Sequence, residues 1–201
     1  YILVVIFTFP VETVLLPKFY SRLFEVVRKN IVPISSVTSS NIGPSILNAD
    51  SVGTLATIMI IWIASYPKSG NTWLRALIST YFFSKDGAFD DALLKNIDQF
   101  PTKQYFQNFN HDKNTAGDTC KFWIKAQENI NLNKNLKFFK THNIFGKVNN
   151  SDFTNNQNSI GCIYVVRDPR NVITSLKNHY QLDNDQAFSW ITNEKNYIYN
   201  I

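Results

Sequence analysis

Residues 60–73, with the sequence IIWIASYPKSGNTW, pass from an unbroken apolar run into a Pro-Lys-Ser-Gly turn and then into an amphipathic segment. An apolar run rich in β-branched and aromatic residues, without polar alternation, predicts a strand buried on both faces, as in parallel sheets. The turn offers backbone N–H groups, a lysine and hydroxyl groups at the start of the following helix. Because unpaired amides and the helix dipole concentrate positive charge there, we expect the turn to bind an anion.

Two further strands are predicted downstream, at residues 136–142 and 160–166, each rich in apolar residues. Helical periodicity and helix-boundary signals predict helices between the strands and after them. The predicted helices span residues 73–82, 90–100, 121–129, 170–180 and 183–199. Strands that alternate with helices indicate an α/β fold, in which a parallel sheet is covered by helices on both faces.

Each predicted strand ends in residues that can do chemistry: Lys68 after the first, Lys140 and His142 on the second, and Arg167 on the third. Ligands bind at the carboxyl ends of strands in such sheets. Residues i and i+2 of a strand face the same side, so Lys140 and His142 should project together. An imidazole that titrates near neutrality suits removal of a hydroxyl proton. Arg167 and the Ser175 hydroxyl predict a second anion site.

These residues also have simpler interpretations. Pro-Lys-Ser-Gly can be an ordinary turn, His142 a structural or exposed histidine, and Arg167 the ion-pair partner of Asp168. The turn is not a Walker loop, because its lysine precedes the single glycine. No strand ends in an aspartate suited to Mg²⁺, which disfavours kinase chemistry.

Composition narrows the class of protein. The 201 residues include 44% hydrophobic residues with 16 Phe, 9 Tyr and 4 Trp, which indicates a globular chain with room for one sizeable domain. A net charge of +5 without a Lys/Arg block fits an acidic ligand and argues against a nucleic-acid surface. The cysteines, Cys120 and Cys162, lie far apart, so we expect two free thiols and a cytoplasmic location.

The N-terminal region differs from the rest. Residues 1–17 are apolar, but Pro10 and Glu12 interrupt the run, which is shorter than the ~20 residues that a membrane span needs. The only methionine is Met59. We therefore interpret residues 1–58 as an extension or linker, and hypothesise that Met59 is the natural start and that residues 1–58 are not native. The alternative is a native extension that packs on the domain or contacts a membrane.

Three segments resemble a known family. Residues 66–73 (YPKSGNTW), Lys140-Thr141-His142 and residues 167–175 (RDPRNVITS) are similar, in order, to motifs of the sulfotransferases that use 3′-phosphoadenosine 5′-phosphosulfate. The resemblance covers residues 59–201. It implies a three-layer fold like that of the P-loop nucleotide hydrolases, and a nucleotide-binding transferase that moves a sulfuryl group to a hydroxyl or amine without a metal.

The resemblance also implies a role for each residue. His142 would be the general base, and Lys68 and Lys140 would stabilise the developing charge. Trp73 would stack on the adenine, and Arg167 with Ser175 would bind the 3′-phosphate. The full set of implied cofactor-binding residues is Lys68, Ser69, Gly70, Asn71, Thr72, Trp73, Arg167 and Ser175. Asn71 stands where many family members carry threonine.

One expected segment is missing. The family has a further 3′-phosphate motif near its C-terminus, and nothing similar precedes Ile201. We therefore expect residues 59–201 to be a partial domain, truncated at the C-terminus, with weak or no activity. The acceptor would be a small molecule, carbohydrate or lipid, held by loops at 84–120 and 143–158.

Two other functions stay open. The first is a small-molecule kinase that uses Mg-ATP, because phosphate loops on parallel sheets are shared. The second is a non-catalytic nucleotide-binding domain, against which the intact pair of Lys140 and His142 argues.

Overall fold

The computed structural model describes residues 2–8, 60–112, 115, 117–133 and 135–193, with only the backbone described for residues 2–8. The expectations for residues 9–58 and for Met59 lie outside the described residues. So does the last part of the predicted helix at 183–199.

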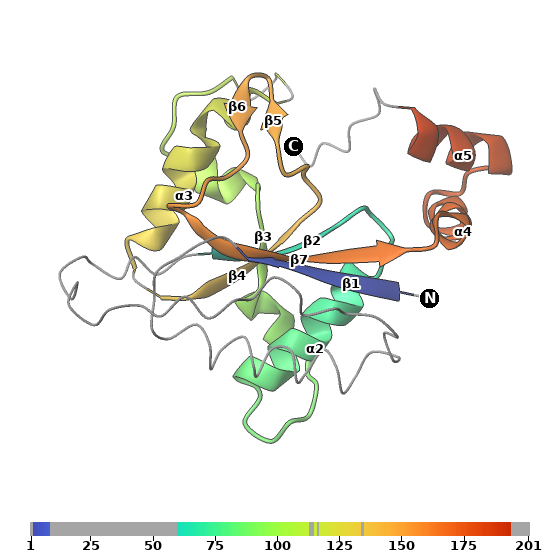
Figure 1. Ribbon diagram of the computed structural model, residues 1–201, viewed down its shortest axis with the longest axis horizontal. Helices are drawn as coiled ribbons and strands as arrows, with labels where there is room; N and C mark the ends of the chain where they lie inside the picture. The colour runs from blue at the N-terminus through green and yellow to red at the C-terminus, as the bar shows by residue number, and fades with distance from the viewer. Residues whose placement is uncertain (1, 9–59, 113–114, 116, 134, 194–201) are drawn as a thin grey trace, which may run out of the picture. The chain divides into compact units, whose positions relative to one another are not determined.

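Within the described residues, a five-stranded sheet has the order β1-β7-β2-β4-β3 (Figure 1). The strands are β1 (Ile2–Thr8), β2 (Ile60–Ser65), β3 (Asp98–Gln99), β4 (Lys137–Thr141) and β7 (Ser159–Arg167). Four of them are parallel, and β1 pairs antiparallel with β7. The predicted α/β fold with a parallel sheet is confirmed. The edge strands β1 and β3 were not predicted.

Strand β2 lies between β7 and β4, and all six of its residues are buried. Alternate side chains face opposite sides of the sheet. Ile60, Trp62 and Ala64 join a core cluster with residues of α3 (Trp123–Asn131). The opposite face is covered by α2 (Asn71–Phe83), as Figure 1 shows. This arrangement explains why the run has no polar alternation.

The α3 side of the core holds a chain of buried polar groups. The Trp62 indole Nε1 donates to Ser159 Oγ at 2.7 Å, and Ser159 Oγ lies 2.6 Å from Thr154 Oγ1. Thr154 Oγ1 donates to Gln127 Oε1 at 2.5 Å, and Gln127 Nε2 donates to the Phe153 carbonyl at 2.6 Å. Because these groups are hydrogen-bonded to one another, their burial does not carry the free-energy cost of burying unpaired polar groups.

The helix predicted at residues 90–100 is wrong in type. The chain forms a short 3₁₀ helix, η1 (Asp91–Asn96), which begins where the Asp90 side chain accepts from the Ala92 N–H. The next residues form β3, whose Gln99 is paired with Lys140 of β4. Pairing with the sheet overrides the local helical pattern, because the chain gains ladder hydrogen bonds at the sheet edge.

The remaining elements connect or cover the sheet. They are η2 (Lys103–Phe106), η3 (Asp118–Phe122), the hairpin strands β5 (Lys147–Val148) and β6 (Ser151–Asp152), α4 (Pro169–Tyr180) and α5 (Asn184–Thr192). Asp168 caps α4 by accepting from the Arg170 N–H. Helix α4 packs against α5 through Val172, Leu176 and Ala187. Among the described helices, none is long and apolar enough to cross a membrane.

Candidate functional site

The three strand ends singled out above lie next to one another. Strand β2 is hydrogen-bonded to β4 on one side and to β7 on the other, and all three run in the same direction. Their carboxyl ends therefore meet at one edge of the sheet. Helix α2 begins six residues after β2 ends, and α4 begins two residues after β7 ends. The first N–H groups of both helices lack intrahelical partners and add positive potential at this edge.

The turn between β2 and α2 has an unusual backbone. Lys68 adopts φ 66°, which is uncommon for a residue with a side chain, and Gly70 adopts φ 105°, which favours glycine. The Ser69 N–H donates to the Tyr66 carbonyl at 3.3 Å and closes the turn. The side chain of Arg167 ties β7 to the same turn, since its Nη1 donates to the Lys68 carbonyl at 3.1 Å.

The alternative pairing of Arg167 with Asp168 is not found. Asp168 instead forms an ion pair with Arg170, at 2.6 Å between Oδ2 and Nη2. This pair and the Arg170 N–H lower the pKa of Asp168 to about 2. Ser175 lies in the second turn of α4 and is half-buried. Among the described residues, no hydrogen bond joins Ser175 to Arg167.

The predicted loop residues divide into buried and exposed ones. Ser69 and Asn71 are buried, whereas Thr72 and Trp73 are exposed, the Trp73 side chain to 44%. The Asn71 side chain lies beneath the loop, where its Nδ2 donates to the Ile63 carbonyl at 2.9 Å and to Ser65 Oγ at 3.1 Å. The side chain of Asn71 is thus bound to β2.

The hydrogen-bond partners of His142 determine its tautomer, and its surroundings determine its charge. Its Nδ1 lies 2.7 Å from the Ser65 carbonyl oxygen, which can only accept a hydrogen bond. The proton is therefore on Nδ1, and Nε2 carries the lone pair. Burial lowers the pKa of His142, and the charges of Lys140 and Arg75 lower it further, while the bond to Ser65 opposes this effect. His142 is consequently a neutral base at neutral pH.

The cations at this edge influence one another. Burial lowers the pKa of Lys140, and the neighbouring charges of Arg75 and Lys68 lower it further. Among the described residues, neither Lys68 nor Lys140 forms an ion pair with a carboxylate. Crowded, unpaired cations are an arrangement that an anionic ligand would stabilise.

Two residues at this edge were not predicted. Ser65 positions His142, and Arg75 of α2 lies close enough to affect the pKa values of both Lys140 and His142. Ser65 carries a weak sequence signal, because a serine closes an otherwise apolar strand. Arg75 carries none, since its partners are the carbonyls of Leu94 and Ile97 in a distant segment.

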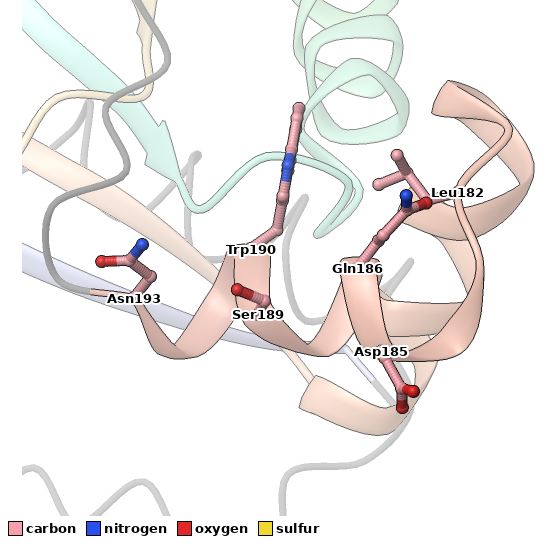
Figure 2. Close-up of a pocket in the computed structure, with 6 residues that line it drawn as sticks. All are labelled: Leu182, Asp185, Gln186, Ser189, Trp190 and Asn193. Carbon is pink, nitrogen blue, oxygen red and sulfur yellow. The ribbon is translucent and has the colours of Figure 1, made fainter.

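Two surface hollows lie elsewhere. Figure 2 shows the first, lined by residues of α5 and its flanks: Leu182, Asp185, Gln186, Ser189, Trp190 and Asn193. None of them is a predicted site residue. The second hollow lies between the two loops expected to hold the acceptor, and its lining consists of Thr115, Gly117, Asp118, Cys120, Lys121, Asn149 and Ser151.

The cysteines match their prediction, because Cys120 and Cys162 are both free and buried. Burial raises the pKa of Cys162 to about 12, which makes it an inert thiol. Within the described part of the chain, no group of three or more His, Cys, Asp or Glu side chains is arranged to hold a metal ion.

Comparison with known families gives one match. The model of the sulfotransferase domain family matches residues 60–198, a segment that contains every predicted site residue. No curated protein and no solved structure matches the chain.

Proposed function

Because the chain belongs to the sulfotransferase domain family, we propose that it transfers a sulfuryl group from 3′-phosphoadenosine 5′-phosphosulfate to a hydroxyl or amine group of an acceptor. The observation that supports this most directly is the state of His142. It is neutral, its Nδ1 proton is held by the Ser65 carbonyl, and its Nε2 is left with a lone pair. A base in this state can take a proton from the acceptor as the acceptor attacks sulfur.

The residues of the site have complementary roles in this proposal. The nucleotide supplies a sulfuryl group activated by a phosphate leaving group. Lys68 and Lys140 stabilise negative charge on the oxygens of the reacting group, which is electrostatic catalysis by preorganised cations. His142 Nε2 accepts the acceptor proton. Burial and the neighbouring cations lower the pKa of Lys140 from its ordinary value, which makes its ammonium a better hydrogen-bond donor to a developing anion.

The binding roles divide between two ends of the nucleotide. At the 5′ end, the first N–H groups of α2 and the residues Ser69, Gly70 and Thr72 surround the phosphosulfate. The exposed indole of Trp73 offers a face for the adenine ring. At the 3′ end, Arg167 retains N–H donors beyond the one it gives to the Lys68 carbonyl, and with Ser175 it binds the 3′-phosphate.

The acceptor class and the location of the protein are proposals of the same kind. The loop 143–158 begins directly after His142, which supports placing the acceptor near that loop. The free thiols support a cytoplasmic location. The division of the chain at residue 59 stays a prediction.

Two measurements test the function. Calorimetry with 3′-phosphoadenosine 5′-phosphate measures nucleotide binding, and a sulfate-transfer assay with phenol, sugar and lipid alcohols measures turnover. We expect Lys68→Ala to weaken nucleotide binding. We expect His142→Gln to lower kcat by about 10²- to 10⁴-fold with nucleotide affinity unchanged. Failure of the chain to bind the nucleotide, or transfer of phosphate from Mg-ATP instead, would contradict the proposal.

A further inference from the structure

We propose that Asn71 is a positioning residue which acts through Ser65 to hold the orientation and tautomer of His142. This inference rests on the proposed function, in which His142 is the base. It differs from the role that the motif resemblance implies for Asn71, namely contact with the phosphosulfate.

The first step is the pair of bonds from Asn71 to β2. Asn71 is the first residue of α2, and its amide nitrogen donates to the Ile63 carbonyl and to Ser65 Oγ, at 2.9 and 3.1 Å. A side-chain amide has two N–H groups, and both are used here. The bonds join the start of the helix to the end of the strand across the whole turn.

The second step leads from Ser65 to the imidazole. Both oxygens of Ser65 face Nδ1 of His142, the carbonyl at 2.7 Å and Oγ at 3.3 Å. The carbonyl can only accept, so it holds the proton on Nδ1. The bonds from Asn71 to the Ile63 carbonyl and to Ser65 Oγ fix the end of β2 and the Ser65 rotamer, and so keep that carbonyl in place against Nδ1. Such a partner keeps the proton on Nδ1 and the lone pair on Nε2, where the reaction needs it.

The third step excludes the ligand role for the Asn71 side chain. The residue is only 4% exposed, and its N–H groups are occupied. The remaining polar atom, Oδ1, is a buried acceptor without a hydrogen-bond partner. An acceptor oxygen repels a sulfate or phosphate group. The backbone N–H of Asn71 is still free to serve the anion, because it belongs to the first turn of the helix.

The experiment compares Asn71→Ala and Ser65→Ala with the wild-type chain. The ¹⁵N NMR signals of the imidazole report the tautomer of His142 without any need for activity, and they are assigned by their loss in His142→Gln among the 3 histidines. Calorimetry with 3′-phosphoadenosine 5′-phosphate reports nucleotide affinity, and steady-state kinetics report kcat and KM. Thr80→Ala is the matched control, because its hydroxyl bonds only within α2, to the Ala76 carbonyl.

We expect the wild-type protein and the control to show the Nδ1–H tautomer alone. Both test variants should show a mixture of tautomers and a kcat lower by about tenfold, the effect of losing one buried hydrogen bond, with nucleotide affinity within about twofold of wild type. Because the two side chains act as one unit, the double variant should lose no more than either single variant.

Other results would overturn the proposal. A tenfold loss of nucleotide affinity in Asn71→Ala with an unchanged His142 spectrum would make Asn71 a ligand contact, and an unchanged spectrum with unchanged kcat would give it no role. If Asn71→Ala does not fold, Ser65→Ala and Asn71→Thr test the same link, since threonine has one donor in place of two. A changed spectrum in a protein whose wild type transfers no sulfate supports the positioning and contradicts the proposed function.

Discussion

Arg75 should influence both the stability of the domain and the charge state of His142. Its Nη2 donates to the Leu94 carbonyl at 3.0 Å and to the Ile97 carbonyl at 2.6 Å, and so joins α2 to the segment that leads into β3. A hydrogen bond from a charged donor contributes about 1.5–3 kcal/mol, so the two bonds contribute about 3–6 kcal/mol. Burial of the cation offsets part of this, as the lowered pKa of Arg75 indicates. We expect Arg75→Met to lower the free energy of unfolding by about 2–3 kcal/mol.

The same substitution should raise the pKa of His142. The groups that act on this pKa are Ser65 of β2, Lys140 of β4 and Arg75 of α2, together with burial. Removing the Arg75 charge leaves burial in place, so the pKa should rise and still stay below its ordinary value. The acidic limb of kcat/KM, which reports the base of the free enzyme, should move to higher pH. Arg75→Lys keeps the charge without the guanidinium fork, so it should lose stability and leave the acidic limb unmoved.

Urea unfolding and an NMR titration of His142 measure the two effects separately. The titration needs no substrate, so it applies even where turnover is low. The reasoning would be refuted by a folded Arg75→Met variant whose His142 titrates at the wild-type pH or below it. It would also be refuted if Arg75→Lys shifted the titration as far as Arg75→Met, because the effect would then come from geometry.

Two further predictions concern stability. Trp62→Phe removes the indole donor to Ser159 Oγ and leaves a buried gap. We expect the free energy of unfolding, measured by chemical unfolding, to fall by about 2–3 kcal/mol, and to change very little in the control Tyr81→Phe, whose side chain is exposed. A loss equal to that of the control would contradict the packing described. The pKa of His142 in the folded state lies below its ordinary value of about 6.5. Between these two pKa values the unfolded state therefore binds more protons than the folded state. The free energy of unfolding should then fall as the pH drops from about 6.5 through the folded pKa. His142→Gln should flatten the stability curve in that window and leave the region above it unchanged, and a slope equal to wild type in urea unfolding would exclude the lowered pKa.

The centre of the fold was predictable because its signals are local. Three patterns follow one another in the sequence: the apolar run of β2, the turn, and the helical periodicity of α2. Each of these patterns usually forms one kind of secondary structure. The parallel arrangement then required the ends of β2, β4 and β7 to meet at one edge. Residues far apart in the sequence, such as Lys68 and Arg167, were therefore expected close together without any contact being known.

The edge strands were not predictable in the same way. Strand β3 consists of Asp98 and Gln99 only, and neither residue favours a strand. The pairing of Gln99 with Lys140 depends on the neighbouring strand being in place. For β1, the residues Ile2–Thr8 were compared with a membrane-spanning segment, although a run in which six of seven residues are β-branched or aromatic also fits an edge strand.

The motif at residues 66–73 does not by itself predict which of its side chains face solvent, and the conformation of the turn explains why. A motif identifies which residue types gather at a turn, but the direction of each side chain depends on the backbone. Here the backbone has positive φ at Lys68 and again at Gly70, and the side chains of Ser69 and Asn71 are buried. Residues whose side chains are buried in this way can bind an anion only through their backbone N–H groups. The groups that can contact a ligand directly are then the Lys68 amine, the exposed side chains that follow the turn, and the helix amides, while the buried Asn71 side chain is bound to β2 beside His142.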